Sequence, residues 1–106
     1  MALYVGKGVL RAFATDEAVA VAEALGCPVV CPRHYPDAFP NDHDQYAGTV
    51  GMADHPAAVS ALEGADAVLS IGVRPSSHEA AVLGDRTDTD VDITYVHAGQ
   101  VEFPRS

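Results

Sequence analysis

Residues 65–74, ADAVLSIGVR, constrain the fold of this chain more than any other stretch. The short apolar run that ends at Gly72 is typical of a strand buried on both faces of a parallel sheet. Ligands bind outside the carboxyl ends of such strands, where a glycine lets backbone approach closely and an arginine offers a planar set of donors. Gly72 and Arg74 are therefore a candidate anion contact. A tight strand-to-helix turn with a solvated Arg74 is the alternative.

The first part of the chain has the pattern of a strand–helix–strand unit. An apolar run over 2–5 followed by Gly6-Lys7-Gly8 predicts a strand that ends in a glycine turn, although the full G-x-G-x-x-G fingerprint is absent. Thr15 is the expected N-cap of a helix that Gly26 ends, and residues 28–31 are the next expected strand. Because parallel strands need such a crossover, we expect a right-handed βαβ unit.

The rest of the chain continues this alternation. Asp54 or His55 is expected to cap a helix with Pro56 in its first turn, and Ser76 with Glu79 resembles a capping box for a short helix. The remaining expected elements are a strand over 67–71, a helix over 77–83, a strand over 93–96 and an edge strand or linker over 101–106.

The tract from 32 to 52 differs in character, with three prolines and mixed polar residues that predict a long ordered loop. Its candidate metal ligands or acid–base groups are His34, Asp37, Asp42, His43 and Asp44. One interpretation is a small enzyme that uses His43 with Asp42 or Asp44. The favoured interpretation is a solvated acidic loop, since no helical or strand spacing brings these side chains together.

The two cysteines, Cys27 and Cys31, lie four residues apart across the start of an expected strand. At that spacing their side chains share a face, but their Cα atoms stand too far apart for a disulfide. Buried thiols in a reducing compartment are therefore expected, and a metal site would need more ligands.

The composition is strongly acidic: ten Asp and five Glu stand against five Arg and one Lys, for a net charge of −9. This excess argues against nucleic acid and anionic membranes as partners, because phosphates would be repelled. The 106 residues fit one domain, and neither a membrane-spanning run nor a signal-peptide pattern is visible, so we expect a cytoplasmic protein.

Four motifs follow one another over nearly the whole chain: VGKG at 5–8, AEALGCPVV at 22–30, PNDH, YAG and GM within 40–52, and ADAVLSIGVR at 65–74. Their order resembles the central domain of thiamine diphosphate-dependent enzymes of the acetolactate synthase, pyruvate oxidase and pyruvate decarboxylase group. The resemblance implies an α/β fold of the Rossmann-like, three-layer α/β/α kind, with a mainly parallel, six-stranded sheet. In this family some members bind FAD or ADP and others have lost the ligand.

The resemblance also implies a set of cofactor-binding residues. Gly6 and Gly8 would pass close to a nucleotide, Gly51 and Met52 would border it, and Gly72 with Arg74 would face its phosphates or flavin. His97 stands where an acidic residue often follows the last strand and could still donate or accept a hydrogen bond. Two departures from the family pattern are Tyr35-Pro36-Asp37 in place of Gly-Lys-Gly and Asp44 in place of a proline.

Thiamine diphosphate and magnesium are held in this family by flanking domains, whose catalytic glutamate and Gly-Asp-Gly motif have no counterpart here. We therefore expect a central domain without catalytic or metal-binding residues of its own. Its function would be that of an FAD- or ADP-type nucleotide-binding module, or of a subunit of a split enzyme with thiamine-binding partners, and a homodimer is a further candidate assembly. A purely structural or interaction domain with an empty ancestral site is the alternative.

The acidic composition also predicts adaptation to concentrated salt, which screens self-repulsion between carboxylates. We expect the melting temperature of the chain to rise between low and molar KCl, as followed by circular dichroism. A melting temperature that stays flat over this range contradicts the hypothesis.

Overall fold

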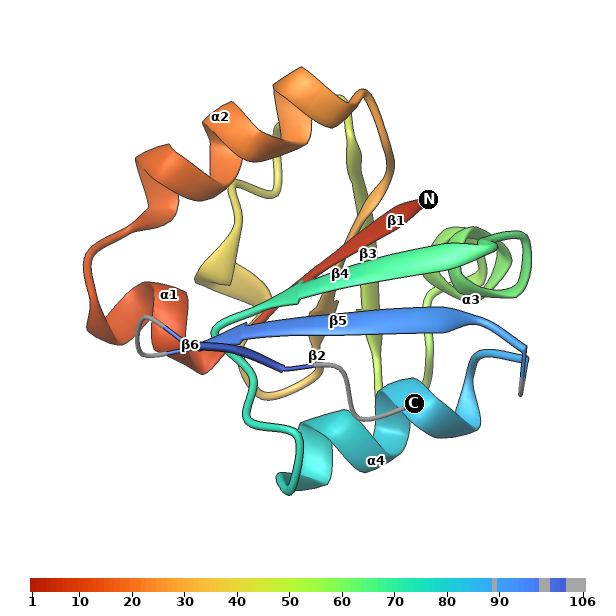
Figure 1. The fold of residues 1–106 in the computed structure, drawn as a ribbon. Helices are drawn as coiled ribbons and strands as arrows, with labels where there is room; N and C mark the ends of the chain where they lie inside the picture. The colour runs from red at the N-terminus through yellow and green to blue at the C-terminus, as the bar shows by residue number, and fades with distance from the viewer. Residues whose placement is uncertain (89, 98–99, 103–106) are drawn as a thin grey trace.

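The computed structural model describes residues 1–88, 90–97 and 100–102, with side chains described up to residue 96. It has three layers: helices α1 and α2 lie on one face of a twisted sheet, and α3 and α4 lie on the other (Figure 1). No helix in this part of the chain is long and apolar enough to cross a membrane.

The elements alternate along the chain much as the sequence predicts. Their bounds are β1 (Ala2–Val5), α1 (Lys7–Arg11), α2 (Thr15–Leu25), β2 (Val29–Pro32), the 3₁₀ helix η1 (Pro36–Ala38), β3 (Tyr46–Val50), α3 (Pro56–Glu63), β4 (Ala67–Ile71), α4 (His78–Asp85), β5 (Asp92–His97) and β6 (Gln100–Glu102).

The strand order is β3-β2-β1-β4-β5-β6, so the sheet grows outward in both directions from the β1–β4 pair. The first five strands are parallel, which confirms the Rossmann-like α/β fold with a mainly parallel sheet. The sixth strand is the exception within this mainly parallel sheet, because β6 pairs antiparallel with β5. Only two residues join these strands, too few for the crossover that a parallel neighbour requires.

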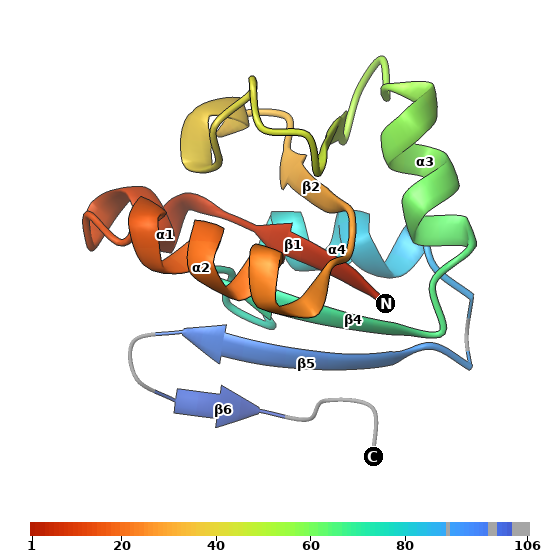
Figure 2. The ribbon, with the colours of Figure 1, turned by 90° about the horizontal axis from the view of Figure 1, so that it is seen from above.

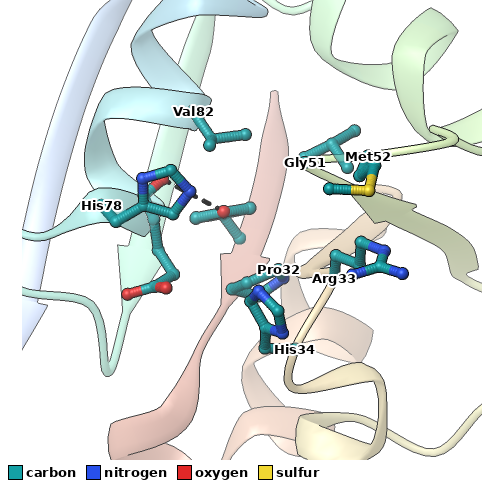
Figure 3. Close-up of a pocket in the computed structure, with 10 residues that line it drawn as sticks. Pro32, Arg33, His34, Gly51, Met52, His78 and Val82 are labelled. Atoms are coloured by element: carbon teal, nitrogen blue, oxygen red, sulfur yellow. Dashed lines mark hydrogen bonds between the residues drawn. The ribbon is translucent and has the colours of Figure 1, made fainter.

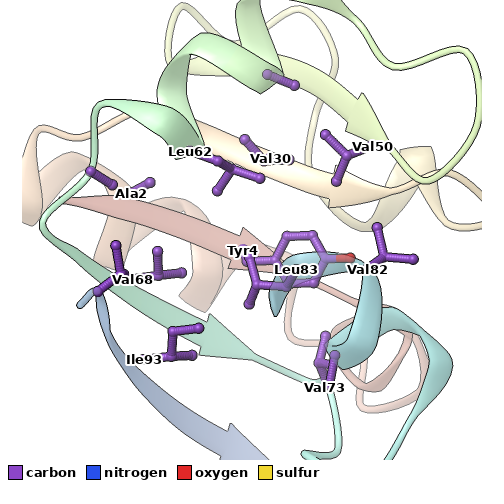
Figure 4. Close-up of a cluster of buried hydrophobic side chains, with 14 of the residues drawn as sticks. Ala2, Tyr4, Val30, Val50, Leu62, Val68, Val73, Val82, Leu83 and Ile93 are labelled. Atoms are coloured by element: carbon purple, nitrogen blue, oxygen red, sulfur yellow. The ribbon is translucent and has the colours of Figure 1, made fainter. Parts of the chain in front are cut away.

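Alternation along β1 supplies both halves of the core. Tyr4 packs with Leu62 and Leu83 on the side of α3 and α4 (Figure 4), whereas Leu3 packs with Val9 and other buried side chains on the side of α1 and α2. All four residues of β1 are fully buried. Each large apolar side chain buried in this way contributes about 1.5–3 kcal/mol to the hydrophobic stabilisation.

The strand β3 corrects the sequence prediction, which treats the whole 32–52 tract as a loop. Its sequence, YAGTV, has no continuous apolar run, and Gly48 in its middle has a φ of +119°. This glycine makes room for His55: a Cβ at Gly48 would lie 2.3 Å from the imidazole Nδ1. His55 Nδ1 accepts a hydrogen bond from the Thr49 amide at 2.9 Å, so a contact from outside the strand supports it.

Three helix starts differ from the sequence prediction, whereas His55 is the N-cap of α3 as expected. The glycine turn after β1 is in fact the start of α1, with Gly6 as N-cap, and α2 starts at Thr15 with Ala14 as N-cap. Helix α4 is capped by Ser77 rather than Ser76, since Ser77 Oγ accepts a hydrogen bond from the Ala80 amide at 3.2 Å.

Other local predictions are confirmed. Gly26 ends α2 with a φ of +63°, and Gly64 is the C-cap of α3. Cys27 and Cys31 are buried free thiols, and burial raises the pKa of Cys31 to about 12. At that pKa the Cys31 thiol stays protonated and behaves as a small core side chain.

The carboxyl ends of β1 and β4 meet through two glycines. The Gly8 amide donates to the Gly72 carbonyl at 2.9 Å, and the Gly72 amide donates to the Val96 carbonyl at 2.9 Å. Gly72 has a φ of +75°, and a Cβ there would lie 2.7 Å from the Val9 amide nitrogen. We call this contact between Gly8 and Gly72 the glycine crossing.

Substitution at the glycine crossing should be costly. Gly72→Ala combines a left-handed backbone, which costs about 1–2 kcal/mol for a residue with a Cβ, with an overlap that the packed backbone cannot relieve. We expect a larger loss of unfolding free energy in urea than for Gly26→Ala.

Gly26 is the matched control, because its φ of +63° is similar and a Cβ there would meet nothing within 4 Å. Equal losses in the two variants would show that the glycine crossing is not tightly packed.

Candidate functional site

A groove of about 500 Å³ opens at the carboxyl edge of the sheet, between the ends of β1 and β4. After β1 the chain continues to α1 on one face of the sheet, and after β4 it continues to α4 on the other. One wall comes from α1 and the residues after it, and the other comes from the β4–α4 loop and the start of α4. In open α/β sheets, ligands bind at this topological switch point. The volume lies within the range of about 300–1,000 Å³ typical of small-molecule sites.

The groove is positively charged although the chain as a whole is acidic. Three of the six Lys and Arg residues of the chain line it: Lys7, Arg11 and Arg74. Within the described part of the chain, none of the three forms an ion pair with a carboxylate. Lys7 Nζ lies over the Tyr35 ring, 5.8 Å from its centroid, and no carboxylate among the described residues neutralises any of the three charges. This arrangement suits the anion contact predicted for Arg74.

The backbone around the groove divides into amides that are used by the fold and amides that are not. Gly8 and Gly72 give their amides to the glycine crossing and to β5, and the Ser77 amide donates to the Arg74 carbonyl at 3.0 Å. The amides of Val73 and Arg74 form no backbone hydrogen bond to described residues. In the strand-to-helix loop that holds the candidate anion contact of Gly72 and Arg74, these amides remain as donors.

Some of the predicted site residues line the groove, and others lie beneath it or beside it. Gly8, Gly72 and Arg74 line the groove, whereas Gly6 lies beneath it: a Cβ at Gly6 would lie 2.3 Å from the Val73 side chain. His97 ends β5 next to Val96, which lines the groove, but the His97 side chain lies outside the described residues.

Gly51 and Met52 line a second, smaller hollow of about 50 Å³ at the carboxyl ends of β1, β2 and β3. Figure 3 shows His78 on one side of this hollow and Gly51, Met52 and Arg33 on the other, with His34 between them. Glu79 lines both the hollow and the groove, so the two spaces are neighbours that share one wall.

An ion pair holds the Gly51 segment in place. Asp54 Oδ1 accepts from the Gly51 amide at 2.8 Å, and Asp54 Oδ2 accepts from Arg86 Nε at 2.7 Å. The Asp54 side chain is only 15 % exposed. The hydrogen bond from Arg86 holds the pKa of Asp54 below its ordinary value, and so ties the β3–α3 loop to the end of α4.

Of the candidate His and Asp residues of the 32–52 tract, His43 has structural contacts. His43 Nε2 lies 3.0 Å from Glu23 Oε2, and His43 Nδ1 accepts from the Gln45 amide at 3.1 Å. Gln45 in turn donates to the carbonyls of Ala22 and Cys27. These bonds fasten the loop to α2. The described residues contain no group of three or more His, Cys, Asp or Glu side chains placed to hold a metal ion.

Sequence reasoning missed Lys7, Arg11 and Glu79 as groove residues. Lys7 had a usable signal, because it sits inside the glycine turn at the end of a strand. Arg11 and Glu79 had none, since the groove brings together residues that are about 70 positions apart in the sequence. Only the pairing of β1 with β4 makes them neighbours.

The comparison with known families decides the assignment. Residues 1–102 match the family model described as "Thiamine pyrophosphate enzyme, central domain". The chain belongs to this family. The match confirms the resemblance seen in the sequence motifs.

Similar proteins include two acetolactate synthases and an acetyltransferase. The chain is 38 % identical over 96 residues to acetolactate synthase of Mycobacterium leprae and to the acetolactate synthase large subunit of Corynebacterium glutamicum, which covers 91 % of this chain and 15 % of each relative. It is 41 % identical over 69 residues to sulfoacetaldehyde acetyltransferase of Castellaniella defragrans, which covers 65 % of this chain and 12 % of that protein. The chain thus spans about one seventh of the length of these relatives.

The Asp54–Arg86 pair generates a prediction about acid stability. The pKa of Asp54 is lower in the folded state, so its stabilisation is present above its unfolded pKa of about 3.9 and is lost as the pH falls below it. Asp54→Asn should cost about 1–3 kcal/mol of unfolding free energy at pH 7, because hydrogen bonds to a charged group are lost. This gap should narrow progressively below about pH 4, as the pH falls towards the lower folded-state pKa of Asp54.

Urea unfolding at several pH values measures the effect, with Asp66→Asn as the control because the Asp66 side chain is 95 % exposed. A gap between the wild type and Asp54→Asn that stays constant down to pH 3 would rule out the ionised pair as its cause.

Proposed function

We propose that this central domain binds an adenine nucleotide of the FAD or ADP type in the switch-point groove, and that it works as a non-catalytic part of a thiamine diphosphate-dependent lyase or transferase. The observation that carries the proposal is the gathering of Lys7, Arg11 and Arg74 around one groove of an otherwise acidic chain. Such concentrated positive charge suits a ligand with several phosphate oxygens.

The rest of the groove fits the other parts of a nucleotide. The three cations and the amides of the β4–α4 loop would hold the phosphates. Val9, Ile71 and Val96 provide an apolar wall suited to a base. The neighbouring hollow at Gly51 and Met52, at about 50 Å³, is too small for a flavin as it stands, so FAD would need the exposed Met52 side chain to move. When bound, FAD would supply a redox-active ring, whereas ADP would supply only binding contacts.

Catalysis by thiamine diphosphate would require partner domains. Within the described residues no set of carboxylates is placed to hold magnesium, and the sequence contains no Gly-Asp-Gly motif. Gly84-Asp85-Arg86, the nearest approximation, lies in and just after α4, where Arg86 pairs with Asp54. The reacting groups would therefore come from thiamine-binding domains, carried on other subunits or elsewhere in a longer polypeptide.

An interaction domain without a nucleotide is the second candidate, and one observation favours it. On the α1–α2 side of the sheet, Leu69, Ile71 and Val96 are half-exposed, whereas Val68 and Ile93 on the opposite side are 2–3 % exposed. Figure 2 shows α1 and α2 over β1, with β5 beside them and not beneath a helix. Parallel sheets are normally covered on both faces, so this surface suits contact with a thiamine-binding partner.

Calorimetric titration of the chain with ADP, FAD and coenzyme A tests the nucleotide proposal. We expect ADP to bind, and Arg74→Ala to weaken it by about tenfold, because a charge-assisted hydrogen bond to phosphate is worth about 1.5–3 kcal/mol. Arg33→Ala is the matched control, since Arg33 is an exposed arginine that lines the neighbouring hollow and not the groove.

Equal losses in the two arginine variants would point to non-specific charge attraction. An absence of binding for all three ligands at millimolar concentration would contradict the nucleotide proposal and leave the interaction domain as the better description.

A further inference from the structure

We infer that Glu79 is a specificity residue, which accepts hydrogen bonds from the ribose hydroxyls of the bound nucleotide and excludes nucleotides phosphorylated on that ribose. The inference rests on the proposed function and adds the ligand class: an adenine nucleotide with a free ribose diol.

The position of Glu79 is firmly set. It lies in the first turn of α4, behind the Ser77 cap, and its carbonyl accepts a hydrogen bond from the Tyr4 hydroxyl at 3.1 Å. Tyr4 is fully buried in β1, so this bond ties the start of α4 to the central strand of the sheet. The backbone of Glu79 is therefore held at a fixed place on the groove wall.

The Glu79 carboxylate has no partner within the described part of the chain. No hydrogen bond or ion pair reaches its oxygens, although the residue is half-buried and shares the groove with Lys7, Arg11 and Arg74. Asp54 shows the contrast, since its oxygens accept bonds from Gly51 and Arg86. The Glu79 carboxylate is therefore free to accept hydrogen bonds from a ligand that brings donors.

The groove has three positive side chains and one negative side chain, which suit different parts of a ligand. Phosphate groups are attracted by the three cations and repelled by Glu79, so the carboxylate must face an uncharged part of the ligand. Ribose hydroxyls are neutral donors, and a carboxylate that accepts from them is an established way of recognising an unphosphorylated ribose. A phosphate on the ribose would bring two negative charges against Glu79, which is discrimination by repulsion.

A simpler role for Glu79 is purely structural. An acidic side chain in the first turn interacts favourably with the helix dipole and so stabilises the helix. That role changes the stability of the fold but does not distinguish one nucleotide from another, so ligand discrimination separates the two.

The test measures dissociation constants for two matched ligand pairs: ADP with 2′-deoxy-ADP, and AMP with adenosine 2′,5′-bisphosphate. For the wild type we expect loss of the 2′-hydroxyl to weaken binding several-fold, and addition of the 2′-phosphate to weaken it by about tenfold or more. In Glu79→Gln both ratios should fall towards one. Glu63→Gln, an exposed change at the end of α3, should leave both ratios as in the wild type.

Each remaining outcome overturns the inference. Unchanged ratios in Glu79→Gln, in a variant whose melting temperature shows it to be folded, would leave only the structural role. Tighter binding of all four ligands by a common factor would show that Glu79 merely repels phosphate. If the wild type bound none of the nucleotides, the proposed function would fail together with the inference, whereas binding of ADP without discrimination would overturn the inference alone.

Discussion

The structure depends on the contact between two glycines at the carboxyl edge of the sheet. Gly8 and Gly72 approach so closely that a methyl group at either would lie within 3.0 Å of the other segment's backbone. Their amides join β1 to the end of β4 and β4 to β5. This contact lets α1 begin directly above the end of β4, and so brings Lys7 and Arg11 opposite Arg74 and Glu79 across one groove.

The glycine crossing also changes how the family glycines are understood here. The Gly8 amide donates to the Gly72 carbonyl, the Gly72 amide donates to Val96 of β5, and Gly6 lies beneath Val73. Packing of the fold is therefore sufficient to require glycine at these positions. The side chains of the groove, and not its glycines, therefore indicate a ligand. Three cations without a carboxylate partner, and one carboxylate without a cation, among the described residues of a chain of net charge −9 are the features that packing does not require.

The sequence predicted most of the fold because its signals are local. Residues far away in the chain are not needed to predict the apolar runs of β1, β2, β4 and β5 or the glycine after α2. Strand β3 could not be predicted in the same way, since it depends on pairing with β2 and on the room that Gly48 leaves for His55. The groove was half predictable: Gly72 and Arg74 adjoin a recognisable strand, but only the pairing of β1 with β4 places Lys7, Arg11 and Glu79 beside them.

The central claim, that the switch-point groove holds a nucleotide, is tested most directly by following the backbone amide resonances of the ¹⁵N-labelled chain as ADP is added. The account predicts saturable shifts in the residues that line the groove, above all Lys7, Arg74 and Ser77, with the Gly48–Thr49 segment, which neither lines the groove nor borders it, unchanged. Shifts spread evenly over the exposed residues, or an unchanged spectrum at millimolar ADP, would contradict it.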